Sequence, residues 1–277
     1  MGLRTALFSR TQPGGVFTFD DLAEHPGNIW FVDASAAGAG NTVGHGQSPD
    51  SPFSTLAYAF SSDLMASGDV VYVLPGHTES ISAAGTITMD IAGVTVIGLG
   101  YGSKRPVLTW TATDATIAIS AAAVRLKNIL TEVTIDEVVS MFNVTGPWVE
   151  FDRVDFRLNT SAEEAIQFIL ASAAATDLWV HHCRHHQATA AAANASWIDF
   201  IGARTIIEDN VFDIELTNSA SSKILANGTA AIGLVISRNR IFAISAGAIP
   251  ISCHASSEGI ATDNRVVSTG TLAGKIA

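Results

Sequence analysis

A run of histidines around a single cysteine is the part of this sequence best suited to chemistry. Four of the eight histidines lie within residues 181–186, which read His-His-Cys-Arg-His-His. Zinc and other borderline metals take histidine and cysteine ligands, and alternate residues of a strand share one face, so members of the run could converge. Arg184 interrupts the run, however, and no Cys-x-x-Cys pair completes four ligands, so we assign no metal or cofactor. The side chains that qualify by residue type alone are His181, His182, Cys183 and His185.

The same run has three other interpretations. Cys183 as a nucleophile with a histidine base would need a bend that brings the two side chains together, and an oxyanion hole. A contact surface that responds to pH is a second interpretation, because histidine titrates near neutrality. The simplest is that the run supplies ordinary corner and surface positions, and this is the interpretation that we prefer.

Carboxylates are a second source of chemistry, because glycosidases use two of them about 5–10 Å apart across the scissile bond. Asp152 and Asp155 lie in one segment, and Glu208, Asp209 and Asp213 lie farther along the chain. Stacked repeats would place opposite charges on neighbouring segments, which favours the stack slightly. This charge ladder explains the acids without catalysis, so we assign no catalytic residue. Its expected members are Lys127, Asp152, His182, Asp209, Arg238 and Asp263.

Tryptophans offer a third possibility, because flat aromatic faces suit the apolar faces of sugars. Four of them could line a sugar-binding groove. Side chains of this kind are more often core residues or subunit contacts. The four are Trp110, Trp148, Trp179 and Trp197.

The composition limits the partners of the protein. Its 277 residues suit one large domain or two small ones, and 48% hydrophobic residues are enough for a sizeable core. Charged residues make up only 15% and the net charge is −11, which argues against binding to nucleic acid. No apolar run reaches the roughly 20 residues of a membrane-spanning helix, and the first residues lack the apolar stretch of a signal peptide. We therefore expect neither a nucleic-acid partner nor a membrane partner.

Short apolar runs recur from residue 70 onward. Six segments align so that they end at residues 128, 153, 183, 210, 239 and 264, which are 25 to 30 residues apart. A strand-rich repeat of about 25 residues is typical of a β-solenoid, whose coils stack because none can bury its apolar face alone. Asparagine suits a fixed corner of such a stack, since it tolerates left-handed backbone and can hydrogen-bond between coils. The predicted corner ladder is Asn128, Asn210, Asn239 and Asn264.

Two other architectures fit less well. Leucine-rich repeats have a similar period, but their recurrent Leu-x-x-Leu-x-Leu pattern is missing. A β-sandwich needs hairpin signals between its strands, and Asn227-Gly228 is the only Asn-Gly pair in the sequence. The β-sandwich stays open as the alternative fold.

Differences in polarity and in the pattern of apolar residues divide the chain into four parts. Residues 1–28 are polar and irregular and indicate an extended N-terminal arm, whereas residues 29–69 hold a strand, a loop and a capping helix. Residues 70–267 correspond to the parallel β-helix, and residues 268–277 to a C-terminal tail. The two ends of the repeat region would expose strand edges, so we expect the helix to cover the first of them.

The capping helix is expected over about 52–66. Ser51 would be its N-cap, with Pro52 in the first turn. The apolar residues have the i, i+3, i+4, i+7 spacing of one helical face. They are Phe53, Leu56, Ala57 and Phe60.

Segments at the start of the repeats resemble a known fold family. Residues 68–76 read Gly-Asp-Val-Val-Tyr-Val-Leu-Pro-Gly and, with residues 51–56 before them, look like the opening coil of pectin-lyase-like right-handed parallel β-helix proteins. Residues 94–98 resemble the next coil. The resemblance covers about residues 29–267 and implies an all-β, single-stranded parallel β-helix of about seven to eight coils. This fold hosts lyases, hydrolases, epimerases and non-catalytic virion proteins, so it does not determine the function.

The resemblance also suggests a role. Small members rich in alanine and glycine look most like bacteriophage structural proteins, and the family implies that trimers are common. No acid cluster here matches the calcium or hydrolytic sites of the enzymes. We therefore expect a non-catalytic virion protein, assembled in the cytoplasm of a bacterial host, that decorates or cements the capsid as a homotrimer. Its partners would be the major capsid protein or other virion proteins.

The N-terminal arm would attach this protein to the head surface, and an arm that orders on binding needs several apolar anchors. The alternative is a tailspike-like protein that binds or cleaves bacterial surface polysaccharide. A free enzyme of the lyase type, which would depend on calcium, is a third possibility. The expected anchors are Leu3, Leu7, Phe8, Phe17 and Phe19.

Overall fold

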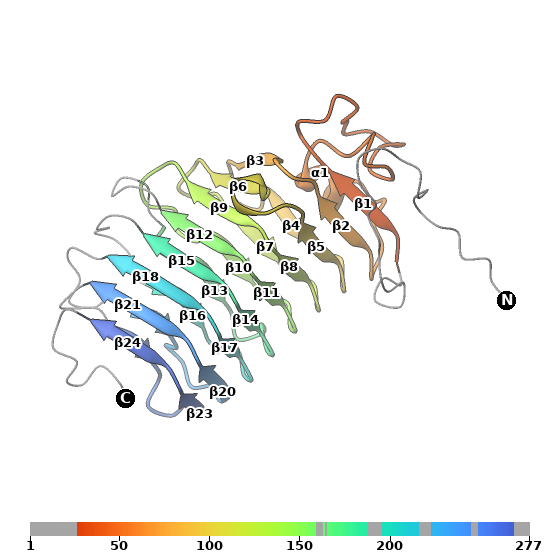
Figure 1. The fold of residues 1–277 in the computed structure, drawn as a ribbon. Coiled ribbons are helices and arrows are strands. Elements are labelled where there is room, and N and C mark those ends of the chain that lie inside the picture. Colours follow the sequence, from red (N-terminus) through yellow and green to blue (C-terminus); the bar gives the residue numbers. More distant parts are fainter. Residues whose placement is uncertain are drawn as a thin grey trace.

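The computed structural model describes residues 27–158, 163, 165–187, 196–215, 223–244 and 249–268. In this part of the chain the protein is a parallel β-solenoid with almost no helix (Figure 1). Three parallel sheets run along it, and the chain passes through about six turns between the first and last strands of the smallest sheet. The predicted all-β solenoid is confirmed, and it is consistent with the pectin-lyase-like β-helix fold.

Each coil adds one strand to each sheet in turn, and we number the sheets in the order in which a coil enters them. The first sheet contains β1 (Ile29–Val32), β2 (Val70–Val73), β5 (Thr95–Gly98), β8 (Arg125–Lys127), β11 (Glu150–Asp152), β14 (Trp179–His181), β17 (Ile206–Glu208), β20 (Ile232–Ser237) and β23 (Glu258–Thr262). The second contains β3 (Thr78–Ile81), β6 (Val107–Trp110), β9 (Leu130–Val133), β12 (Asp155–Leu158), β15 (Arg184–Gln187), β18 (Val211–Glu215), β21 (Arg240–Ile244) and β24 (Arg265–Ser268). The third contains β4 (Ile87–Met89), β7 (Ile117–Ile119), β10 (Phe142–Val144), β13 (Ile169–Ala171), β16 (Ser196–Phe200), β19 (Lys223–Ala226) and β22 (Ile249–Ser252). A short 3-10 helix, η1 (Gly102–Lys104), lies between β5 and β6.

The core is a set of apolar columns that run from coil to coil. In the first sheet, Leu126 pairs with Phe151, which pairs with Val180, and all three are fully buried. Aromatic side chains fill the interior between the sheets, where the rings of Phe142 and Phe156 lie 6.0 Å apart. Burial of a large apolar side chain contributes about 1.5–3 kcal/mol. One continuous core therefore holds the stack together.

The corner after the strands of the first sheet has one recurrent backbone conformation. From β8 to β23 the residue that follows the strand has a left-handed φ of 53–56°. Asn and Asp tolerate this conformation, but Arg and His adopt it at a cost of about 1 kcal/mol or more. The stack offsets that cost, since the corner amides of Arg153 and Arg238 donate to the strand-end carbonyls of His181 and Thr262. The corner residues are Asn128, Arg153, His182, Asp209, Arg238 and Asp263.

An asparagine ladder follows this corner. The Oδ1 atom of Asn239 accepts from the backbone and side-chain amides of Asn210 at 3.1 and 3.0 Å. Its Nδ2 atom donates to Oδ1 of Asn264 at 3.0 Å and to the carbonyl of Ile207 at 2.9 Å. Three of the four predicted ladder residues, Asn210, Asn239 and Asn264, thus form one chain of hydrogen bonds, which is buried at Asn210 and Asn239.

Asn128 lies outside this ladder, one position earlier in its coil. It is itself the left-handed corner residue, and its Nδ2 atom donates to the carbonyl oxygens of Gly98 and Gly100. The predicted alignment of the segments that end at 128 and 153 was therefore wrong by one residue. As a result, the corner column contains His182 but not Lys127 or Asp152, which pair with the strand-end residues instead.

The capping helix is shorter than the sequence predicted. The helix α1 (Leu56–Ser61) begins after Thr55, whose Oγ1 atom accepts from the amide of Tyr58 at 3.1 Å. The prediction that Ser51 caps this helix was wrong, because Phe53 bridges to β1 through two backbone hydrogen bonds and is fully buried. The buried face of α1 packs against β4 and β1 and covers the first end of the core. Within the described residues, no helix has the length and apolarity needed to span a membrane.

A buried carboxylate fixes α1 to the first coil. Glu79 in β3 accepts from the amides of Leu56 and Ala57 at 2.6 and 3.0 Å, at the N-terminus of the helix. His77 accepts from the amide of Ala34 through Nδ1, so its Nε2 atom carries the proton and donates to Glu79 at 3.2 Å. The start of the helix, the loop after β1 and the second sheet are thus joined at one point.

Replacement of Glu79 by Gln should lower the free energy of unfolding by about 2 kcal/mol, because a buried amide group would face one of these donors. Urea unfolding would measure the change. Glu132→Gln, at a partly exposed position of β9, is the control and should change stability by less than about 0.5 kcal/mol. Equal effects of the two substitutions would contradict the role given to Glu79.

Replacement of Asn239 by Ala should cost about 3–4 kcal/mol, since four hydrogen bonds are lost and their partners stay buried. Asn264→Ala removes a partly exposed member of the same ladder and should cost about half as much. Thermal or urea unfolding of both variants tests this order, and a smaller loss for Asn239→Ala would argue against a ladder that stabilises the stack.

Candidate functional site

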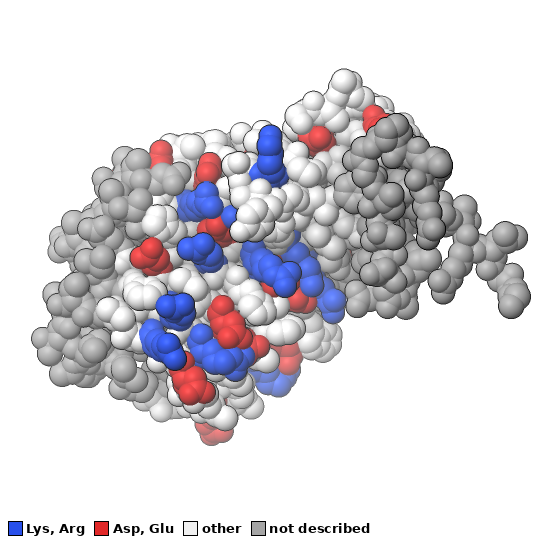
Figure 2. Space-filling model, viewed as in Figure 1, with Lys and Arg blue, Asp and Glu red and all other residues white. Residues whose placement is uncertain are grey.

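Charged side chains gather along the corner between the first and second sheets. Figure 2 shows Lys, Arg, Asp and Glu interspersed there, on a face that is otherwise largely uncharged. The band includes the strand-end and corner residues of β8, β11, β14 and β17. Because the strands are in register, residues from neighbouring coils meet side by side.

The left-handed corner decides which side chains of residues 181–186 face this band. A regular strand would alternate, but the conformation of His182 breaks the alternation, so His181 and His182 both lie outside the core. Val180 and Cys183 on either side of the pair are buried in the core. The expectation that alternate members of the run would converge was therefore wrong, since it is two consecutive histidines that meet.

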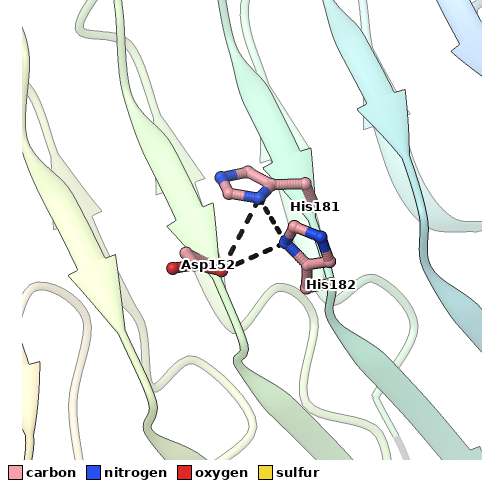
Figure 3. A group of neighbouring side chains, drawn as sticks. All are labelled: Asp152, His181 and His182. Carbon is pink, nitrogen blue, oxygen red and sulfur yellow. Dashed lines mark hydrogen bonds and ion pairs between the residues drawn. The ribbon is translucent and has the colours of Figure 1, made fainter.

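The two histidines close on a carboxylate of the preceding coil (Figure 3). The Nδ1 atoms of His181 and His182 lie 2.7 Å apart. The Oδ1 atom of Asp152 lies 3.6 Å from the first and 3.4 Å from the second. These three atoms form a compact group of possible metal ligands. Asp152 and His181 are buried, whereas the side chain of His182 is 52% exposed.

A second carboxylate orients His181. Its Nε2 atom lies 3.2 Å from Oε1 of Glu150, which also forms ion pairs with Arg125 at 3.2 Å and Lys127 at 3.5 Å. The hydrogen bond with His181, together with these cations, lowers the pKa of Glu150, although burial opposes the shift. The ring of His181 also stacks on Trp179 at 3.9 Å. Sequence reasoning missed Glu150, because only the true register places it beside Trp179.

The other acids considered for glycoside cleavage are held by cations. Burial alone would raise the pKa of Asp155, but hydrogen bonds from Arg105 at 2.6 Å and Arg157 at 3.0 Å outweigh it and lower that pKa. Asp209 is bound by Arg238 at 2.8 Å, which lowers its pKa as well.

Glu208 and Asp213, the two remaining acids, also contact neighbouring side chains. Arg238 also contacts Glu208, which accepts from the indole of Trp179 at 3.0 Å. Asp213 lies 3.3 Å from His186 on the exposed face of the second sheet. The carboxylates of the band thus join neighbouring coils.

Two of the four side chains selected by residue type lie in the core. Cys183 is fully buried, and burial raises the pKa of its thiol to about 12. His185 stacks between Phe156 at 4.6 Å and Phe212 at 4.3 Å, and neither ring nitrogen has a hydrogen-bond partner. Burial lowers the pKa of His185 to about 3. Neither side chain reaches the group formed by Asp152, His181 and His182.

The structure places the four tryptophans considered for sugar binding, two in the core and two at the surface. Trp110 and Trp197 are fully buried, whereas Trp148 and Trp179 are exposed. The arm anchors predicted from the sequence lie outside the described residues: Leu3, Leu7, Phe8, Phe17 and Phe19.

Neither a protein-family model, nor a curated protein, nor a solved structure matches this chain.

Replacement of His185 by Leu should stabilise the protein by about 1 kcal/mol at pH 7, since it removes two unpaired buried nitrogens and keeps the volume. The gain should grow as the pH falls from about 6.5 toward about 3. In that range the unfolded chain binds the histidine proton and the folded protein does not, so the free energy of unfolding of the parent protein decreases by up to about 1.4 kcal/mol per pH unit.

Urea unfolding of the parent and the variant at several pH values measures this difference. His254→Leu, at an exposed position, should show no such growth. A constant difference between parent and His185→Leu would contradict the neutral, buried state given to His185.

Proposed function

We propose that the protein is a non-catalytic structural component of a bacteriophage particle, which decorates or cements the capsid. The observation that carries this proposal is that the acidic side chains of the charged band form ion pairs with basic side chains of other coils. The acids most suited to catalysis by residue type contact basic side chains, as with Asp155 and Arg105 or Glu150 and Lys127. These side chains support the shape of a rod, which is what a capsid-binding component needs.

The fold itself suits a stiff spacer. In a solenoid each coil contacts only its neighbours, so the molecule is built as a line of repeated units. Here apolar columns run from coil to coil, and the asparagine ladder joins the coils of β17, β20 and β23. Exposed ion pairs contribute little to stability, but they favour one register over another.

Self-association is supported by apolar side chains on the last coils. Ile232, Ile260 and Val267 are each more than half exposed, and every residue of β23 is exposed. Apolar side chains that are exposed on a single chain can take part in subunit contacts. We propose a homotrimer that uses this surface, and attachment to the major capsid protein through residues 1–28.

Binding of bacterial surface polysaccharide is the second candidate function, as in a tailspike-like protein. Trp148 is 59% exposed in the turn before β11, and Trp179, in β14 of the next coil, is 38% exposed with one face covered by His181. Exposed aromatic faces of this kind can stack on sugar rings. Incubation with capsule or lipopolysaccharide of the host tests it, and release of reducing ends or unsaturated sugars would overturn the non-catalytic proposal.

Deletion of residues 2–20 should abolish binding to capsids that lack this protein and leave the trimer intact. The reason is that the arm carries the proposed apolar anchors, whereas the solenoid carries the trimer contacts. Copy counting on purified particles and analytical ultracentrifugation measure the two properties. Capsid occupancy equal to that of the full chain would refute attachment through the arm.

A further inference from the structure

We infer that Asp152, His181 and His182 form a binding site for a divalent cation of the zinc class. The ligand atoms would be Oδ1 of Asp152 and the Nδ1 atoms of both histidines, as they converge in Figure 3. This inference does not rest on the proposed role in a phage particle, because it follows from the geometry of one corner of the solenoid.

The distances fit a single ion. The three ligand atoms form a triangle with edges of 2.7, 3.4 and 3.6 Å. The circle through its corners has a radius of about 1.9 Å, so a point just outside its plane lies about 2.0–2.1 Å from all three atoms, the usual length of zinc bonds to histidine and carboxylate. The two Nδ1 atoms would have to move apart by about 0.6 Å to reach the tetrahedral angles that zinc prefers.

The hydrogen bond with Glu150 leaves a lone pair on one of the three ligand atoms. His181 donates through Nε2 to Glu150, so in the neutral ring its Nδ1 atom carries the lone pair, which can accept from His182 or bind a metal. A carboxylate that holds the far nitrogen of a histidine is the usual outer support of a metal ligand. Glu150 is therefore a positioning residue for this site.

Asp152 provides the independent observation. Its side chain is only 6% exposed, and its Oδ1 atom, which faces both histidines, is buried without a hydrogen-bond partner. Lys127 and Arg153 approach the other oxygen, Oδ2, at 3.8 and 3.6 Å. A hydrogen bond between the two histidines would explain their short separation but would leave Oδ1 unpaired. A cation satisfies all three atoms together.

The ligand set indicates the kind of ion and its setting. Two imidazoles and one carboxylate suit zinc and the neighbouring first-row divalent metals better than calcium or magnesium, which prefer oxygen. Three protein ligands leave a fourth position for water, and the 52% exposure of His182 opens the site to solvent. The ion would connect the coil of β11 to the coil of β14.

Titration of the full-length, metal-free protein with Zn²⁺ by calorimetry tests the site. A Cys253→Ser background removes the exposed thiol, which could itself bind zinc. We expect one ion per chain. His182→Gly should lower the affinity at least about 100-fold, because it removes a ligand at a left-handed position that glycine adopts without strain. Asp152→Asn, which keeps the shape of the side chain, should also weaken binding.

His186→Ala is the matched control. His186 is an exposed histidine 3.3 Å from Asp213, and the adjacent His185 is buried between Phe156 and Phe212. This variant should bind Zn²⁺ as the parent does. The inference is overturned if the parent binds no stoichiometric Zn²⁺, if folded His182→Gly and Asp152→Asn both bind as tightly as the parent, or if His186→Ala alone loses the ion.

Discussion

The left-handed corner after the first sheet is the constraint on which the rest of the molecule depends. Six successive coils turn at this point with nearly the same φ angle, although only Asn128, Asp209 and Asp263 are of types that favour it. A single corner geometry keeps the coils in register, so that each apolar column continues and each strand finds its neighbour. It also sets a side-chain pattern of one residue inside, two outside and one inside.

That pattern explains both polar features of the molecule. The inward position after the corner holds Asn210, Asn239 and Asn264, whose amides complete buried hydrogen bonds between coils. The two outward positions place His181 and His182 side by side above Asp152. The same turn of the backbone thus produces a stabilising ladder on its inner side and a cluster of ligand atoms on its outer side.

The sequence allowed the fold to be predicted because the period and the apolar runs are properties of many residues together. The register was predicted less well, because it depends on which single residue adopts the left-handed conformation. Glycine at the corner positions would have indicated the left-handed residue, but Arg153, His182 and Arg238 are not residue types that predict this conformation. The partners of Glu79 at the start of α1 were also beyond sequence reasoning, since they are contacts between segments more than 20 residues apart.

Because each coil contacts only its neighbours, the length of this protein can change in evolution by the addition or removal of whole coils. Duplication of one unit of about 25 to 30 residues would extend the solenoid by one strand spacing, about 4.8 Å, and would leave the helix-covered end unchanged. Genetic gain or loss of whole coils therefore alters reach in fixed steps. A protein of this design can be matched to the distance between two surfaces without a new fold.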